Sequence, residues 1–329
     1  MTFEDRVKAV GEFGFTEKQA GFLVLVLLYS GVCLGRQYCS YSRIGRGQNM
    51  YNFFSDLTAR EFATAYPHAQ SGTHVYHVHS KPLYQAVGEP DSRHRKPVTL
   101  GRAIERLMAL DAVVAAPEVT WLATQHEKVG YFTRVTNVRR EELPRLTFGE
   151  SPQTATQFFP DKLPIGITSD GRGHLFLYIV TRQLPIDFRA FLQRHAALFR
   201  ALPSWAMRLV VPKHLAQSQS LYQRAVQEEL AMPLRPTVRD ELRWFFERRR
   251  NLSEGSAVPS DLRFQRAQRA FGAPRFRRLY RSWLEQGDGV IEATVSPVLA
   301  DAFARRSARV ECHVFRHNYR HLEELVGTA

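Results

Sequence analysis

The sequence has few cysteines, no long apolar run and a deficit of acidic side chains. Its 329 residues include only three cysteines, Cys33, Cys39 and Cys312. Three are too few for the disulfide framework of a secreted protein, and they suit a reducing cytoplasm. The first twenty residues mix charged and apolar side chains, which is not the pattern of a secretory signal. We therefore expect a cytoplasmic protein.

The most apolar stretch is too short for a membrane-spanning helix. It runs from Gly21 to Leu34, whereas a spanning helix needs roughly 17 to 25 residues. Thr16 and Gln19 stand before it with the spacing of a capping box, which marks the start of an ordinary helix. We expect a buried helix from Thr16 to Ser30 and no membrane partner.

Several catalytic and cofactor motifs are missing. The sequence has no Gly-x-x-x-x-Gly-Lys loop to cradle a nucleotide phosphate. It also has no Gly-x-Ser-x-Gly elbow, and no cysteine or histidine stands in the context of a nucleophile. We therefore expect neither an ATP-driven activity nor a cofactor.

Basic residues are abundant. Lys and Arg number 45 against 32 Asp and Glu, which gives a formal charge of +13 and indicates a polyanionic partner or a membrane surface. Thirteen arginines against five acidic residues lie between Arg235 and Arg281, interleaved with aromatic residues. This segment is interpreted either as a phosphate-tracking surface or as an amphipathic helical bundle with a solvated basic face. We favour nucleic acid as its partner.

The segment from Leu34 to Ser80 has the pattern of helix, tight turn, helix and two strands. In its second helix, Gln48 to Arg60, the apolar residues recur at i, i+3, i+4 and i+7. Strands are expected over Phe62 to Ala65 and Thr73 to His79, around a polar loop. We predict a winged helix-turn-helix, with a small helical bundle that has a solvated polar face as the alternative.

Arg, Gln and Asn side chains near the start of the second helix suit the major groove, because they can form paired hydrogen bonds to guanine and adenine edges. Winged domains often bind as dimers on two-fold sites, so a homodimer is one option for the assembly. The residues expected to read bases are Arg46, Gln48, Asn49 and Asn52; those expected on the DNA backbone are Arg36, Arg43, Arg60 and Lys81; and a basic loop beside them, which is alternatively a solvated loop, contributes Arg93, Arg95 and Lys96.

The sequence as a whole predicts an α+β protein in three regions: a winged-helix domain at 1–148, an α/β domain at 149–232 and a basic, mainly helical region at 233–329. In the middle region the third strand should run parallel to the second, because a helix connects them. The expected strands are Tyr131 to Val135, Leu163 to Ile167, His174 to Thr181, Met207 to Val211, Val290 to Val295 and Arg309 to Phe315; the expected helices include Val98 to Asp111, one around Trp121 to Val129, Pro185 to Leu202, Leu215 to Leu230 and Pro297 to Arg306.

Two groups of histidines are candidate metal ligands. His77 and His79 would share one face of a strand, but no further ligand is evident nearby. His313, His317 and His321 recur every four residues beside Cys312, yet the first of them falls in an expected strand and the spacing fits no standard zinc finger. We expect no metal site.

The winged segment opening Thr16-Glu17-Lys18-Gln19 and the strand-turn-strand-helix-strand region opening Phe159-Pro160-Asp161 together resemble the replication-relaxation family of plasmid and mobile-element proteins. The resemblance covers roughly residues 14 to 230. It implies a winged helix followed by a domain like a decayed PD-(D/E)xK nuclease. In that motif Asp161 would bind Mg²⁺, but Tyr178 and Val180 occupy the positions of the second acid and the lysine.

A lone Asp161 supplies too little charge for a Mg²⁺ site, so it is interpreted as a vestigial catalytic residue. The leading hypothesis is a non-enzymatic protein that binds double-stranded DNA for a plasmid or mobile element, in replication control, transcriptional regulation or recombination. Replication or recombination proteins of that element would be its partners. The alternatives are a metal-dependent nuclease or nickase that uses Asp161, and an assembly factor that binds RNA or protein.

Overall fold

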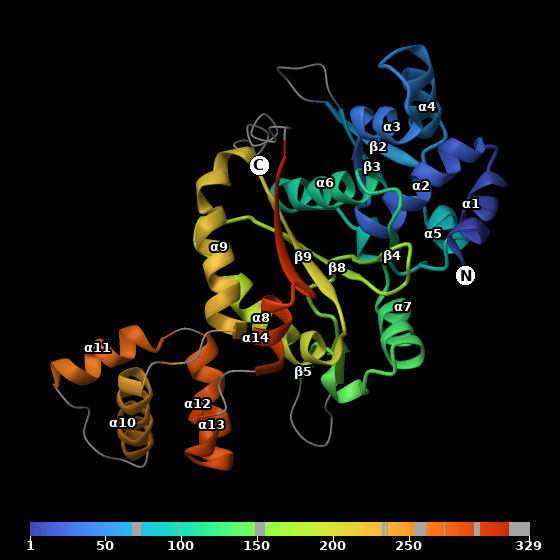
Figure 1. The fold of residues 1–329 in the computed structure, drawn as a ribbon. Helices are drawn as coiled ribbons and strands as arrows, with labels where there is room; N and C mark the ends of the chain where they lie inside the picture. The colour runs from blue at the N-terminus through green and yellow to red at the C-terminus, as the bar shows by residue number, and fades with distance from the viewer. Residues whose placement is uncertain are drawn as a thin grey trace.

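The computed structural model describes residues 1–67, 74–97, 99–148, 155–231, 234, 236–253, 261–272, 274–292 and 297–315. Within these residues the protein is a mixed α+β structure with three sheets (Figure 1). Several predicted segments reach beyond the described residues. They are the loop from residue 68 to Thr73, Val98, the boundary at 149–154, Ala293 to Val295, and His317 with His321.

The N-terminal unit surrounds a helix that is buried on all sides. Thr16 caps this helix and forms the predicted capping box with Gln19. Every residue from Ala20 to Tyr29 is buried, which explains the apolar run in the sequence. In the described part of the chain, no helix is both long and apolar enough to cross a bilayer. The elements of the unit are α1 (Phe3–Gly11), α2 (Glu17–Tyr29), β1 (Val32–Leu34), α3 (Gly35–Ser42), α4 (Gln48–Ala59), β2 (Ala63–Pro67), β3 (His74–Val78) and α5 (Lys81–Ala86).

A three-stranded antiparallel sheet completes this unit. Its strand order is β1-β3-β2, so the short β1 pairs with the second strand of the β2–β3 hairpin. Helices α3 and α4 and both hairpin strands were predicted. β1 was not, because three consecutive buried residues without alternation carry no strand signal.

A five-stranded mixed sheet forms the second unit, in the order β10-β9-β8-β7-β4. β8, β9 and β10 are parallel, and the predicted parallel pairing of β8 with β9 is confirmed. β7 and β4 are antiparallel to their neighbours. The sheet draws its strands from all three predicted regions: β4 (Thr120–Leu122), β7 (Ile165–Ile167), β8 (His174–Ile179), β9 (Trp205–Val211) and β10 (Ala308–Val314).

Helices cover both faces of this sheet. Along β8, Phe176 lies in the core that includes helix α8 (Ile186–Ala201), whereas Leu177 and Ile179 lie in the core that includes helix α6 (Leu100–Val114). This alternation follows from the pleat of a strand. The core around α6 also contains residues of β1 and β3, so α6 joins the two units.

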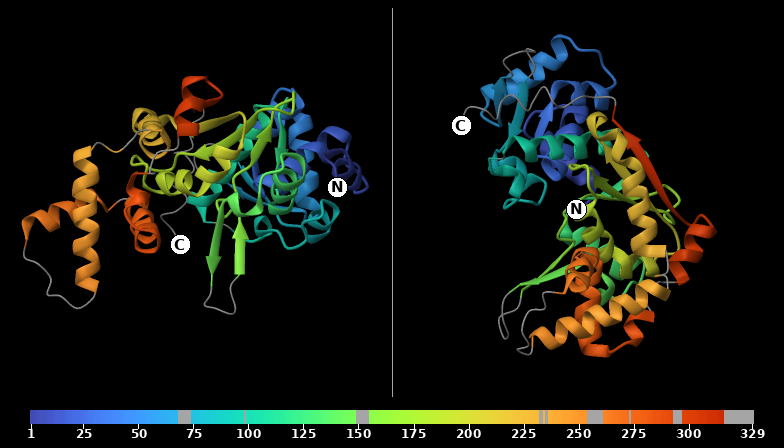
Figure 2. Two further views of the ribbon diagram at one scale, coloured as in Figure 1. Left: turned by 60° about the horizontal axis from the view of Figure 1, so that its bottom comes forward. Right: turned by 90° about the vertical axis from the view of Figure 1, so that its left-hand side faces the viewer.

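The C-terminal helices form a separate layer to one side (orange in Figure 2). Aromatic residues such as Phe245, Phe246 and Trp283 make up their core, as the helix-like spacing predicted. The remaining elements are α7 (Gln125–Gly130), β5 (Arg145–Phe148), β6 (Ala155–Phe158), α9 (Gln219–Val226), α10 (Pro236–Ser253), α11 (Leu262–Ala270), α12 (Pro274–Gln286), α13 (Gly289–Glu292) and α14 (Pro297–Ala304).

Three local predictions were wrong. Tyr131–Val135 is a π-helix that continues α7 rather than a strand, and the Thr133 and Thr136 hydroxyls donate to carbonyls four residues earlier. Trp121, expected in a helix, lies in β4 and pairs with Gly166. Val290 lies in helix α13 rather than in a strand, where Ile291 is packed in the aromatic core of the C-terminal helices.

Candidate nucleic-acid interface

Helix α4 presents a polar face to solvent and an apolar face to the protein. Phe53 stacks on Tyr38 of α3 with ring centroids 4.4 Å apart, and Phe54 stacks on Tyr76 of β3 at 4.0 Å. These contacts fix the helix to both neighbouring elements. Met50, Phe53, Phe54 and Leu57 are buried, whereas Gln48, Asn49, Tyr51, Asn52 and Ser55 are exposed.

The turn before α4 brings further polar groups to the same end of the helix. Arg43 ends α3 in the left-handed conformation, with φ of 55°, and its side chain is exposed, as is that of Arg46. Gln48 Nε2 donates to Asn52 Oδ1 across one helical turn at 2.6 Å. Arg46, Gln48, Asn49 and Asn52 therefore belong to one continuous segment with accessible side chains, called here the α4 face.

Tyr51 was not among the predicted site residues, although 62% of its surface is exposed on α4. An aromatic residue ordinarily counts toward a core. The sequence signal was its position: Tyr51 falls outside the i, i+3, i+4, i+7 set that is buried. The α4 face thus includes an exposed aromatic ring beside its amides.

Two predicted backbone-contact residues already have partners within the protein, Arg36 in a mostly covered position and Arg60 at the surface. Arg36 makes two 2.7 Å hydrogen bonds to Asp111 of α6, and only 17% of its side chain is exposed. Arg60 pairs with Asp56 at 3.1 Å and donates to the Phe13 carbonyl. It also lies over the Phe15 and Phe62 rings. Both arginines hold elements of the N-terminal unit in place.

The second predicted basic cluster lies at the other end of α2. Arg93, His94 and Arg95 form a 3₁₀ turn, η1 (Arg93–Arg95), which approaches Gly31 just after α2. The α3–α4 pair instead meets α2 nearer its start, where Gly21 faces Tyr41. Arg95 donates to the Pro90 carbonyl at 2.6 Å, while Arg93 and Lys96 are exposed, as is Lys81 at the start of α5.

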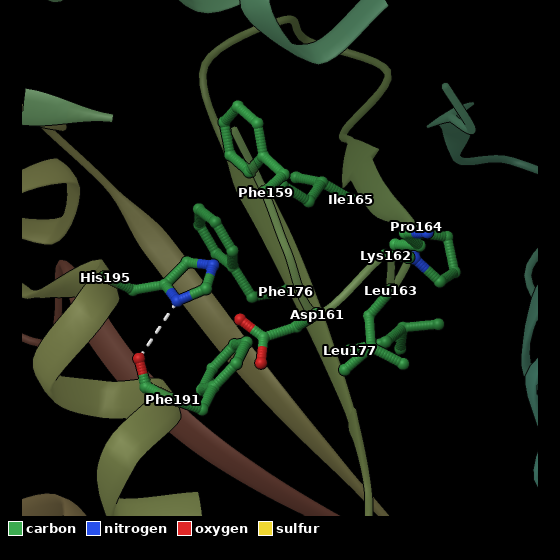
Figure 3. Close-up of a pocket in the computed structure, with 10 residues that line it drawn as sticks. All are labelled: Phe159, Asp161, Lys162, Leu163, Pro164, Ile165, Phe176, Leu177, Phe191 and His195. Atoms are coloured by element: carbon green, nitrogen blue, oxygen red, sulfur yellow. Dashed lines mark hydrogen bonds between the residues drawn. The ribbon is translucent and has the colours of Figure 1, made fainter. Parts of the chain in front are cut away.

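Asp161 is engaged by an arginine. Its carboxylate forms an ion pair with Arg194 of α8 and points toward His195 and Phe191 in a small apolar pocket (Figure 3). Burial lowers the pKa of His195 to about 4. The residues that the structure describes contain no group of three or more His, Cys, Asp or Glu arranged to hold a metal ion.

The positions expected for a second acid and a lysine lie in the core. Val180 is fully buried, and Tyr178 packs on the Phe188 and Phe191 rings at 4.5 and 5.1 Å. Burial, together with the neighbouring Tyr222, raises the pKa of Tyr178 far above its ordinary value. These two side chains supply neither the charge nor the access that a Mg²⁺ site requires.

The strand histidines have partners within the N-terminal unit. His77 is buried, with Nε2 2.9 Å from the His94 carbonyl. The His79 Nε2 lies 3.0 Å from the Thr64 hydroxyl. His313 lies in β10, and the other two histidines of its series are outside the described residues.

Protein-family models, curated proteins and solved structures yield no match to this chain.

Proposed function

We propose that the N-terminal unit is a winged helix-turn-helix that binds double-stranded DNA through the α4 face. The order of helices and strands and the antiparallel β1-β3-β2 sheet support this assignment. The observation that carries it is the division of α4 into an aromatic face fixed to the protein and an amide-rich face open to solvent. Such a helix suits the major groove.

Within this proposal, Asn49 and Asn52 read adenine edges and Arg46 reads guanine, because these side chains match the paired donors and acceptors of those bases. The Gln48–Asn52 hydrogen bond orients both amides before DNA arrives. Arg43 and Lys81 contact the backbone. Arg36 and Arg60 are left out of the contact, since their guanidinium groups already have partners within the protein.

The wider proposal places the protein in the cytoplasm, in the replication, transcription or recombination of a plasmid or mobile element. The five-stranded sheet would serve as a nuclease-like scaffold, in line with the resemblance to the replication-relaxation family. The arginine-rich helices α10–α12, which pack on a shared aromatic core, would extend the contact with DNA.

Selection of bound sequences from a random duplex pool tests this proposal, followed by affinity measurements at fixed salt. Asn49→Ala and Asn52→Ala should each weaken binding to the selected site by about 1–3 kcal/mol and relax the preference at one base pair. Gln223→Ala, which removes an exposed amide on α9, is the matched control.

Two results would contradict the proposal. One is a pool without enriched sequences; the other is unchanged affinity in both α4 variants. Incubation of supercoiled plasmid with Mg²⁺ or Mn²⁺ addresses the nuclease alternative, because cleavage that disappears in Asp161→Ala would assign catalysis to the sheet unit instead.

A further inference from the structure

A cavity of about 400 Å³ lies where the N-terminal unit meets the turn between β6 and β7. It is called here the junction cavity. Four segments line it: the end of α2, the η1 turn, the start of α7 and the β6–β7 turn. Its lining includes five charged residues, Glu89, Asp91, Arg93, Lys128 and Lys162, together with His94.

The cations of the junction cavity have carboxylates near them but no direct ion pair. Among the described residues, no carboxylate lies within ion-pair distance of Arg93, Lys128 or Lys162, although Glu127 and Asp161 are close enough to Lys128 to act on its pKa. Lys128 is only 1% exposed, and its ammonium group donates to the Leu163 carbonyl at 2.7 Å. An ammonium has three donors, so two remain for a ligand. A buried charge without a partner is costly.

His94 also has an unused polar atom. The residue is 7% exposed, and its Nδ1 has no hydrogen-bond partner among the described residues. Buried polar atoms are nearly always hydrogen-bonded, so an unpartnered one requires an explanation. His94 lines the junction cavity, and the Ser30 backbone is the neighbouring polar group that acts on the pKa of its ring.

The β6–β7 turn places Lys162 at the cavity in a costly backbone conformation. Phe159 and Lys162 both adopt left-handed conformations, with φ of 47° and 57°, although neither is glycine. The Lys162 N–H donates to the Phe159 carbonyl at 3.0 Å, and Asp161 between them is anchored to Arg194. Such conformations persist where the surroundings enforce them, and they cluster at ligand sites.

The lining of the cavity carries charges of both signs. Burial, and then repulsion by Arg93, lowers the pKa of Lys162. Burial raises the pKa of Glu89. An anion beside Arg93 and Lys162 would relieve their repulsion, and hydroxyl or amino groups would suit Glu89 and Asp91.

We propose that the junction cavity binds a phosphate-bearing small molecule of nucleotide size. Arg93 and Lys162 hold the phosphate, the Lys128 ammonium group adds positive charge, and Glu89 and Asp91 receive hydroxyl or amino groups. The volume lies in the range of small-molecule sites.

Calorimetry on the full chain tests this site with inorganic phosphate, nucleoside monophosphates, nucleoside triphosphates and a short duplex as probes. At least one small phosphate compound should bind, and Lys162→Ala and Lys128→Met should each weaken it at least tenfold. Lys213→Ala, an exposed lysine remote from the cavity lining, should leave binding unchanged. If Lys128→Met does not fold, Lys162→Ala alone decides.

The inference is overturned if no small phosphate binds at millimolar concentration, if both cavity variants bind as well as the native chain, or if the duplex competes for the site. It is independent of the proposed DNA interface. Lys162→Ala should bind selected DNA as the native chain does, and Asn49→Ala should keep its affinity for the small phosphate, so either proposal can fail alone.

Discussion

Replacing Lys128 by Met should change how the stability of the protein depends on pH. Burial lowers the pKa of Lys128 from 10.5 to about 7, against the smaller opposing effect of Glu127. Glu127 itself is paired with Arg6 at 2.6 Å and accepts from the Ala123 N–H at 2.8 Å. Arg93, Asp161 and His195 are the other charged or titratable groups near the Lys128 amine.

The magnitude follows from the two pKa values. A tenfold change in proton affinity corresponds to about 1.4 kcal/mol, so the folded state holds the charged amine at a cost of about 5 kcal/mol. The unfolded lysine stays protonated up to about pH 10.5. The loss of folding stability caused by the charged Lys128 amine is therefore complete below pH 7, and it disappears as the pH rises from 7 to 10.5.

The Met substitution removes this cost but leaves the Leu163 carbonyl without its donor, a loss of about 1–3 kcal/mol. At pH 6 Lys128→Met should thus be more stable than the native chain by about 2–4 kcal/mol. At pH 10 the difference should vanish or reverse.

Urea denaturation from pH 6 to pH 10 in phosphate-free buffer measures this difference. Titration of tyrosine and cysteine affects both proteins equally and cancels in the comparison. Lys213→Met, with an exposed side chain, is the control and should follow the native curve. A constant difference between Lys128→Met and the native chain at every pH would refute the reasoning.

Two further substitutions test the packing of the N-terminal unit by the same urea assay. Gly31 has φ of +73°, and a Cβ there would lie 2.5 Å from a carbonyl oxygen of η1, whereas Gly14, at +85°, has no described atom within 4 Å of that position. Gly31→Ala should therefore destabilise by about 1–3 kcal/mol more than Gly14→Ala; equal losses would contradict the contact. Arg36→Ala should lower stability by about 3 kcal/mol, since it removes two hydrogen bonds and an ion pair to Asp111, which is only 10% exposed. Arg43→Ala should instead leave stability within about 0.5 kcal/mol of the native chain and weaken DNA binding. A destabilised Arg43→Ala beside a stable Arg36→Ala would be evidence against these assignments.

The sequence was sufficient to predict the fold where a local pattern of apolar residues determines which side chains are buried. The spacing of Met50, Phe53, Phe54 and Leu57 predicted both faces of α4, and all four residues are buried. The parallel pairing of β8 with β9 followed from the helix between them. The first inference needs only the spacing of apolar residues along a helix. The second needs only the rule that a helix connecting two neighbouring strands makes them parallel.

Interactions between distant segments could not be predicted in this way. Arg36 looks like a surface residue until Asp111, 75 residues later, is folded against it. Lys128 follows Gln, His and Glu on a short helix, a context typical of a solvated lysine, yet the β6–β7 turn covers it. The junction cavity combines four separate segments, so no single stretch of sequence carries a signal for it.

The position of β10 has a consequence for the order in which the chain can fold. β10 is the edge strand beside β9, but the helices α9–α14 separate the two in the sequence. During synthesis, β9 is exposed on that edge until the ribosome has released the whole helical segment and β10. An unpaired hydrophobic strand edge attracts other chains. The C-terminal helices have their own aromatic core and can fold during this interval. Their folding shortens the flexible connection between β9 and β10, so the entropy cost of pairing the two strands is smaller.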